Sequence, residues 1–258
     1  GAKSGLTSIG AALKALQSSE SHGSTTINVS GACHENVLIQ GLDRLTLNAV
    51  NGASISDASG GKASVISILD SRDVSINGFT INAGSSGAAD VNGLSCGDWS
   101  SCRLMLNTIQ GAASGTGFAV GQASQATVDG DTFQNNGQGM YVVSGSRVRP
   151  GGQGRPITVR NNSGNGLFVS RQSLAYVFAN IDPNGVHGAR ARFDATLDLS
   201  GSSLSNNGGV GAYISEHSAA RISGNPPAFR NSSRSQYRLT DGTNGFTWSE
   251  SPCIYSLN

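Results

Sequence analysis

Charged residues are scarce in this sequence. Asp, Glu, Lys and Arg make up 13% of its 258 residues, and 17 basic against 16 acidic side chains leave a formal net charge of +1. A chain so close to neutral has no overall electrostatic attraction to nucleic acid, to an acidic polymer or to a membrane surface. Recognition of a charged partner must therefore come from local clusters of side chains.

Long apolar runs are also missing. No stretch approaches the roughly eighteen apolar residues of a membrane-spanning helix, and the N-terminus lacks the basic-then-apolar order of a signal peptide. The chain starts at Gly1-Ala2 without a methionine, which predicts that a leader has been removed or that the chain has been trimmed. We therefore expect a secreted or periplasmic protein with no membrane span.

Cysteines are few, at four. Cys96 and Cys102 bracket a short loop that a disulfide can close, and we expect this pair to form, with two reduced thiols as the alternative. Cys33 and Cys253 lie near opposite ends of the chain and can meet only if the C-terminal tail runs back along the fold. Their pairing stays open.

Glycine, by contrast, is abundant. The chain has 36 glycines but only 6 prolines, a composition that favours a backbone with many tight turns at positive φ. The length and the even composition predict one domain over residues 1–258. Together these features favour an all-β fold with frequent corners.

A repeated template runs through the chain: Gly, an apolar residue, a variable residue and an apolar residue. Its copies are spaced 22 to 27 residues apart and start at Gly117, Gly139, Gly166, Gly188 and Gly211. Two further apolar segments follow in each copy, so one unit supplies three short strands. Such a unit cannot bury its own apolar side chains, but units stacked about 4.8 Å apart bury them in a continuous interior.

Asparagine recurs after the third strand of each unit. The corner contains Asn135-Asn136, Asn161-Asn162, Asn206-Asn207 and Asn231. Stacked Asn side chains can hydrogen-bond to those above and below, and Asn tolerates the left-handed backbone of a tight corner. The repeat and the corner predict an all-β fold, a right-handed parallel β-helix of about nine coils, over residues of about 26–241.

The open ends of such a stack expose strand edges, which invite polymerisation unless they are covered. We expect residues of about 1–25 to form an N-terminal capping α-helix, because Ile9, Leu13 and Leu16 lie at helical spacing behind Ser and Thr residues that can cap it. The aromatic-containing stretch 242–258 breaks the repeat and is expected to form a C-terminal cap or tail.

The template, the Asn corner and the N-terminal helix together resemble the pectate-lyase-like right-handed parallel β-helix superfamily over nearly the whole chain. That superfamily includes polysaccharide lyases, polygalacturonase-type hydrolases, alginate epimerases, phage tailspikes and adhesins. The resemblance thus implies a carbohydrate context but no single reaction. Motifs of its best-known activities are only partly echoed, as in Val186-His187-Gly188 and Asp182-Pro183-Asn184.

Alternation of inward and outward side chains aligns the variable residues of the template in one outward stripe. After residue 140 this stripe changes from small residues to aromatic residues and arginines, namely Tyr141, Phe168, Arg190, Tyr213 and Arg238. Aromatic rings offer flat faces to sugars, and arginines offer forked donors to carboxylates, so the stripe is typical of an acidic-polysaccharide groove. The alternative is that stacked side chains only stabilise the sheet and that the arginines are solvated.

Proton abstraction beside a uronate carboxylate needs a cation for the carboxylate and groups that take and give protons. We assign these catalytic roles to Arg190, Tyr213 and His217, with Arg192 as the alternative cation and Tyr141 and His187 as alternatives for proton transfer. The candidate substrate-binding residues are Tyr141, Phe168, Arg171, Arg192, Asp194, Glu216 and Arg238.

A glycoside hydrolase would need two carboxylates, and Asp194 with Glu216 are the only pair on adjacent coils near the stripe. An ion network with neighbouring arginines is the stronger interpretation of that pair. No dense Asp cluster indicates a calcium site, so we expect no metal and no cofactor. The three-arginine insertion 147–155 is expected to form a wall of the groove, with nucleic-acid binding as its weaker alternative.

These observations predict an exported carbohydrate-active protein whose partner is an acidic polysaccharide rather than nucleic acid. A uronate polysaccharide lyase or epimerase is the first hypothesis. The alternative is a non-catalytic β-helix for glycan binding, adhesion or surface structure.

Overall fold

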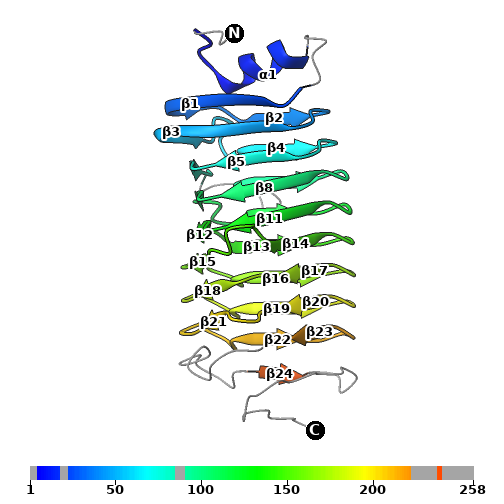
Figure 1. Ribbon diagram of the computed structural model, residues 1–258. Coiled ribbons are helices and arrows are strands. Elements are labelled where there is room, and N and C mark those ends of the chain that lie inside the picture. The colour runs from blue at the N-terminus through cyan, green and yellow to red at the C-terminus, as the bar shows by residue number, and fades with distance from the viewer. Residues whose placement is uncertain (1–4, 18–22, 85–90, 222–236, 240–258) are drawn as a thin grey trace.

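The computed structural model is a stack of parallel β-strands, a parallel β-helix, with one short helix at its N-terminal end (Figure 1). The structure describes residues 5–17, 23–84 and 91–221 and the strand 237–239. The strands mark about eight turns, compared with the nine or so coils expected from the repeat. The parallel β-helix fold predicted from the repeat is therefore confirmed.

Each coil contributes one strand to each of three faces. The first face is a nine-stranded parallel sheet made of β2 (Val37–Gln40), β4 (Ile66–Leu69), β7 (Leu94–Gly97), β10 (Thr116–Val120), β13 (Gln138–Val142), β16 (Leu167–Ser170), β19 (Ala189–Arg192), β22 (Ala212–Ile214) and β24 (Tyr237–Leu239). The template glycines lie in or directly before these strands, so the repeat found in the sequence is the repeat of the first face.

The second and third faces belong to one 15-stranded sheet. The second face contains β5 (Val74–Asn77), β8 (Ser101–Met105), β11 (Gln125–Asp129), β14 (Arg147–Pro150), β17 (Leu174–Tyr176), β20 (Thr196–Asp198) and β23 (Ala219–Arg221). The third contains β6 (Thr80–Asn82), β9 (Thr108–Gln110), β12 (Thr132–Gln134), β15 (Ile157–Arg160), β18 (Ala179–Ile181) and β21 (Ser203–Leu204). The long strands β1 (Thr25–His34) and β3 (Leu45–Ser56) span both faces and join them.

The interior of the coils is filled by the inward side chains of all three faces. In β16, Leu167 and Val169 are fully buried on either side of the half-buried Phe168. Phe118 from the first face stacks on Phe133 from the third, with ring centroids 6.0 Å apart. Burial of each such side chain contributes roughly 1.5–3 kcal/mol, and this continuous core fixes which residue of each strand points outward.

The predicted asparagine ladder is present at the corner between the third and first faces. The Nδ2 groups of Asn136, Asn162 and Asn184 donate to the Oδ1 atoms of Asn162, Asn184 and Asn207, at 3.2, 2.8 and 3.0 Å. All four side chains are buried. Asn184 also belongs to the ladder, although it was not predicted from the sequence because it follows a proline rather than a second asparagine. Asn231 lies outside the described residues.

The corner after the first face is a two-residue turn in the left-handed region. Arg171 and Gln172 have φ values of 54° and 59°, and Glu216 and His217 have values of 53° and 59°. A buried serine follows most of these turns, and its hydroxyl accepts a backbone N–H from the preceding coil, as Ser124 does from Ser100 at 3.0 Å. These hydrogen bonds therefore hold the corners of successive coils in register, as the backbone hydrogen bonds do for the strands.

The helix α1 (Ile9–Gln17) covers the N-terminal end of the stack, as predicted. Ile9 and Leu13 are buried against the first coil. The Glu35 carboxylate accepts the N–H groups of Ile9 and Gly10 at 2.8 and 3.0 Å, which places a negative charge at the helix N-terminus. Among the described residues no helix is long and apolar enough to cross a membrane. The expected C-terminal cap lies outside the described residues.

The expected disulfide between Cys96 and Cys102 is present. It crosses the corner between β7 and β8, and both cysteines are buried. Cys33 is a half-buried thiol whose pKa is raised by burial and by the nearby Glu35 carboxylate. Its pairing with Cys253 stays a prediction, because Cys253 lies outside the described residues.

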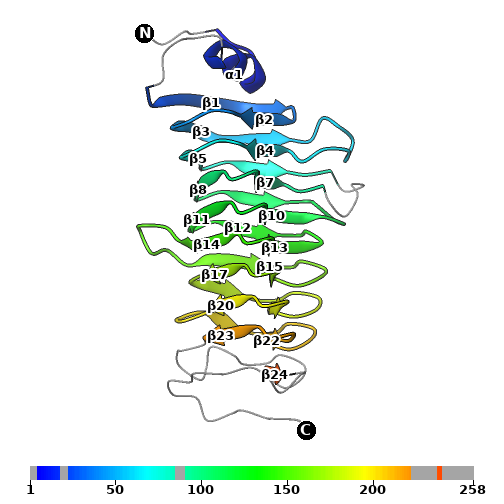
Figure 2. The same ribbon diagram turned by 90° about the vertical axis from the view of Figure 1, so that its right-hand side faces the viewer.

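The three-arginine insertion lies in a different place from the one expected. Strand β14 belongs to the second face, and the loop 151–156 leads from it to β15 of the third face (Figure 2). The Asp129 carboxylate holds this loop by accepting the N–H groups of Gln153 and Arg155, at 2.9 and 3.0 Å. The insertion therefore lies at the corner opposite the first face and is not a wall of the stripe.

Candidate functional site

The outward stripe of the first face is continuous and in register. Parallel pairing aligns its members coil by coil, in the order Leu38, Ser67, Ser95, Ala119, Tyr141, Phe168, Arg190, Tyr213 and Arg238. Only the backbone of Arg238 is described. The change from small to large side chains occurs at Tyr141, where the sequence predicted it.

The large side chains of the stripe form one column. The rings of Tyr141 and Phe168 are stacked, with centroids 5.0 Å apart and planes 21° from parallel. The guanidinium carbon of Arg190 lies 5.2 Å from the centroid of Phe168 and 5.4 Å from that of Tyr213. Each such cation–π contact contributes about 0.5–2 kcal/mol, depending on its desolvation. Arg190 is thus held between two aromatic rings.

This column changes how the stripe can meet a ligand. Because the rings stack along the coil axis, Tyr141 and Phe168 cover each other's facing sides and turn their edges to solvent. The sequence predicted a row of flat ring faces for sugars, and the stripe does not offer one. The edge of an aromatic ring carries the positive end of its quadrupole, so ring edges and the Arg190 cation together favour anionic groups.

The two arginines of β19 differ in their partners. Arg192 forms a two-point ion pair with Glu216, with Nε–Oε2 and Nη2–Oε1 distances of 3.0 and 2.8 Å, and its guanidinium carbon lies 4.0 Å from the centroid of Phe193. Arg190 forms no ion pair with any carboxylate of the described residues, and its buried Nε has no hydrogen-bond partner there. Among the described side chains of the stripe, Arg190 is therefore a cation that no neighbouring carboxylate compensates.

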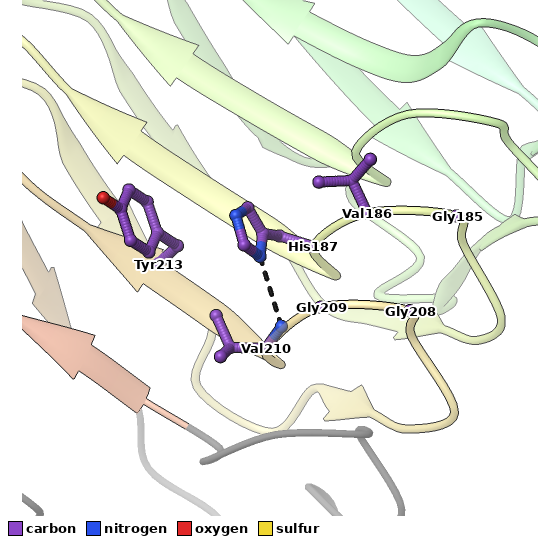
Figure 3. Close-up of a pocket in the computed structure, with 7 residues that line it drawn as sticks. All are labelled: Gly185, Val186, His187, Gly208, Gly209, Val210 and Tyr213. Carbon is purple, nitrogen blue, oxygen red and sulfur yellow. Dashed lines mark hydrogen bonds between the residues drawn. The ribbon is translucent and has the colours of Figure 1, made fainter.

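His187 lies beside the column, directly before the template glycine of its coil (Figure 3). Its ring is stacked on Tyr213 at 4.8 Å, with the planes 5° from parallel. Its Nδ1 accepts the N–H of Val210 at 3.2 Å. A neutral ring in this position consequently carries its proton on Nε2.

A shallow pocket adjoins this histidine. Its volume is about 210 Å³, and it is lined by Gly185, Val186, His187, Gly208, Gly209, Val210 and Tyr213 (Figure 3). A Cβ atom on Gly209 would lie 2.5 Å from His187 Nδ1, and one on Gly208 would meet a backbone carbonyl of the coil above. Glycine is thus required here for the close approach of two coils, and it leaves the pocket wall as bare backbone.

The structure brings some of the predicted site residues together and separates others. Arg190 and Tyr213 are in contact, but His217 lies in the corner after β22, where its side chain is exposed. The histidine in contact with Tyr213 is His187, which the sequence analysis held as an alternative. Arg171 is likewise an exposed corner residue, after β16.

Asp194 and Glu216, the carboxylate pair considered from the sequence, do not occupy the same position in their two corners. The N–H of Asp194 donates to the carbonyl of Glu216, and Asp194 is the second residue of its corner whereas Glu216 is the first. The Glu216 carboxylate is also occupied by Arg192. The ion-pair interpretation of Glu216 is therefore the one that the structure supports. Within the described part of the chain, no group of three His, Cys, Asp or Glu side chains is placed to hold a metal ion.

Comparison with known proteins identifies the fold. No family model matches the sequence, and no curated protein matches it. Among solved structures, the A-module of a mannuronan C-5 epimerase from Azotobacter vinelandii aligns over 90% of this chain and 74% of its own, with a TM-score of 0.57 and 13% identity. A pectin methylesterase from Yersinia enterocolitica aligns over 92% and 95%, with a TM-score of 0.56 and 10% identity. These likenesses confirm the parallel β-helix fold expected from the sequence, and no specific family is shown.

Proposed function

We propose that this protein binds an acidic polysaccharide along the first face and acts on it as a uronate lyase or epimerase. The observation that carries the proposal is Arg190, an arginine fixed between two aromatic rings without a carboxylate partner. Its planar fork matches the geometry of a carboxylate. A sugar carboxylate would supply the missing counter-charge.

The groups beside Arg190 suit a proton transfer. An arginine bound to the uronate carboxylate stabilises the negative charge that develops when the neighbouring carbon loses its proton. The Tyr213 oxygen, in the ring that Arg190 contacts, is proposed to take that proton as its phenolate and to become the neutral phenol. In a lyase this phenol then gives its proton to the leaving oxygen, and the Nε2–H of His187 is proposed to donate a hydrogen bond to that oxygen. In an epimerase a water molecule on the opposite side of the sugar would give its proton to the carbon, and the resulting hydroxide would take the proton back from the Tyr213 phenol.

The partial charge pattern of the stripe supports an acidic substrate. The edges of Tyr141 and Phe168 are electropositive and continue the line of Arg190 over three coils. Two of the similar solved structures carry the names mannuronan C-5 epimerase and pectin methylesterase, so each is named for a polysaccharide. Export to a secreted or periplasmic location is part of the proposal and is supported by the Cys96–Cys102 disulfide.

A non-catalytic binding module is the second candidate. The ion pair between Arg192 and Glu216 favours it, because both charged groups are already engaged with each other. The exposed position of His217, in the corner after β22, favours it as well. On this alternative the same stripe holds an acidic glycan without altering it.

Incubation with a panel of uronate polymers separates the two candidates. A lyase produces unsaturated sugar ends that absorb in the ultraviolet, and an epimerase changes the uronate composition seen by proton NMR. We expect one of these signals, and we expect Arg190→Ala and Tyr213→Phe to abolish it while Leu38→Ala, at the opposite end of the same stripe, leaves it intact. Binding without either signal would replace the enzyme by the binding module, and absence of binding to every polymer would refute both.

A further inference from the structure

A second pair of arginines lies on a different face of the β-helix. In β14 the side chains of Arg147 and Arg149 are exposed on either side of the buried Val148. Alternate residues of a strand point to the same side and are about 6.5 Å apart along it. The two guanidinium groups therefore extend from the second face next to each other.

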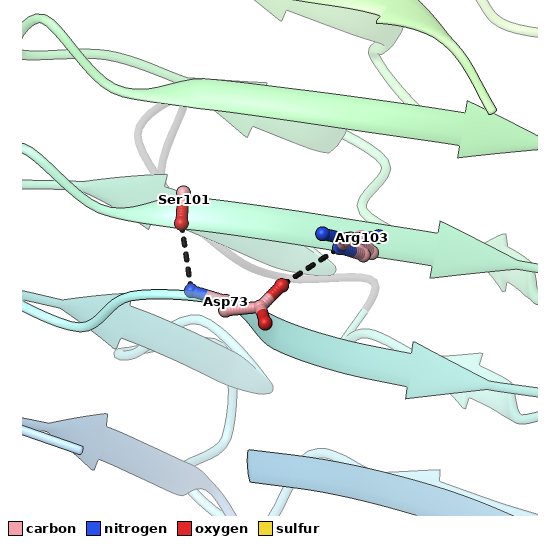
Figure 4. Close-up of polar contacts among 3 residues, drawn as sticks. All are labelled: Asp73, Ser101 and Arg103. Carbon is pink, nitrogen blue, oxygen red and sulfur yellow. Dashed lines mark hydrogen bonds and ion pairs between the residues drawn. The ribbon is translucent and has the colours of Figure 1, made fainter. Parts of the chain in front are cut away.

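The other arginines of the second face have carboxylate partners. Arg103 in β8 pairs with Asp73 of the preceding coil, with an Nε–Oδ1 distance of 2.8 Å (Figure 4). Arg221 in β23 lies 3.9 Å from an oxygen of Asp198 in the same way. Arg147 and Arg149 have no ion pair with any carboxylate of the described chain, because their neighbours in the adjoining coils are Gln125 and Thr127 on one side and Leu174 on the other. Cross-coil pairing is thus the pattern of this face, and β14 departs from it.

Two more features extend this basic pair. Tyr176 follows Arg149 one coil further on and is 41% exposed. Arg155 lies in the loop that follows β14, and the Asp129 carboxylate fixes that loop through two backbone hydrogen bonds. An ordered loop loses little conformational entropy when it contacts a ligand. We call Arg147, Arg149, Arg155 and Tyr176 the β14 surface.

We propose that the β14 surface is a second binding site for an acidic glycan, separate from the stripe of the first face. The inference does not rest on the function proposed for that stripe. The stripe lies on the first face, whereas the β14 surface lies on the second face and at the corner opposite the first. One β-helix would then hold two polyanion chains on different sides and cross-link them.

A glycan is favoured over nucleic acid by the spacing of charge on this face. Asp73 and Asp198 compensate Arg103 and Arg221, so the uncompensated basic charge of this face is confined to the β14 surface. Single-stranded nucleic acid is typically bound along a continuous basic groove with several aromatic stacking platforms, and the β14 surface has one exposed aromatic ring, that of Tyr176. A polymer with one carboxylate or sulfate per sugar can place its charges at the arginines alone.

The full-length Arg190→Ala variant provides the background for the test, because it disables the stripe. Binding of polygalacturonate and of heparin, as probes, is measured at about 0.05 M salt, where surface charge is weakly screened. We expect binding to persist in this variant and to fall at least about tenfold when Arg147→Ala and Arg149→Ala are added, a loss of roughly 1.4 kcal/mol. Arg103→Ala is the matched control: it removes one exposed but paired arginine of the same face and should change affinity less than about twofold.

Each other outcome is decisive. If Arg190→Ala alone abolishes binding, or if Arg103→Ala is as harmful as the β14 pair, the second site does not exist, and the proposal for the stripe is unaffected. If only the β14 pair reduces binding of the wild-type chain, the proposal for the stripe fails and the second site stands. Tighter binding of a single-stranded oligonucleotide than of either glycan, lost in the β14 pair, would overturn the glycan in favour of nucleic acid.

Discussion

Asp131 should make the stability of the β-helix depend on pH in the direction opposite to that of most carboxylates. It is fully buried at the corner between β11 and β12. Its carboxylate accepts the backbone and side-chain N–H groups of Asn107 at 2.9 and 2.8 Å and the N–H of Asp129 at 2.9 Å. Burial nevertheless raises the pKa of Asp131 from 3.8 to about 6, because desolvation outweighs these hydrogen bonds and the Asp129 charge adds to it.

The raised pKa means that the folded chain binds this proton more tightly than the unfolded chain does. The stabilising contribution of Asp131 is therefore fully present below pH of about 4 and is lost as the pH rises through about 6. One pKa unit corresponds to 1.36 kcal/mol, so a rise of about two units corresponds to a loss of up to about 3 kcal/mol. That is a large part of the stability of a typical domain.

The assay is guanidinium unfolding of the wild type and of Asp131→Asn at a series of pH values from 4 to 8. Asparagine keeps the shape and one acceptor oxygen but does not titrate, and the lost contact with Asp129 adds an offset that is independent of pH. As the pH rises, the unfolding free energy of the wild type should fall by up to about 3 kcal/mol relative to that of Asp131→Asn. Two curves that stay parallel over this range would show that the pKa of Asp131 is not raised in the folded chain.

Three further predictions concern the stability of the fold. Asn162→Ala should lower the unfolding free energy by about 3–5 kcal/mol in guanidinium titrations, because it leaves buried amide groups of the ladder without partners; a loss under about 1 kcal/mol would show that the ladder is not stabilising. Reduction of the Cys96–Cys102 disulfide should cost about 2 kcal/mol, and a Cys96→Ala, Cys102→Ala variant should not respond to the reductant. Glu35→Ala should cost about 1 kcal/mol and lower the helical circular dichroism signal, which Glu35→Gln should largely preserve.

The sequence was sufficient to predict most of the fold. The template glycines and the paired asparagines recur once per coil, so the repeat length, the outward stripe and the corner could be found by inspection. Asn184 was not identified as a ladder member because its coil replaces the paired asparagine with Asp182-Pro183. The insertion was predicted to be a wall of the groove, but its first residues form the strand β14. Arg147 and Arg149 are ordinary outward residues of that strand, on the second face.

The chemistry of the site was less predictable. Which residues share the stripe follows from alternation, but the orientation of a ring depends on its rotamer and on the coil above and below it. The stacking of Phe168 between Tyr141 and Arg190 therefore could not be read from spacing. The stacking of His187 on Tyr213 and its hydrogen bond from Val210 join adjacent coils, and the spacing of residues in the sequence does not reveal such contacts.

The most direct test of the acidic-polysaccharide site is the affinity of the full chain for a uronate oligosaccharide, measured calorimetrically for the wild type, Arg190→Gln and Leu38→Ala. Loss of the carboxylate–arginine pair should weaken binding by about 2–3 kcal/mol, which is roughly 30- to 150-fold. Leu38→Ala, in the same stripe but outside the column, should bind as the wild type does. Equal affinity of Arg190→Gln and the wild type would contradict the account.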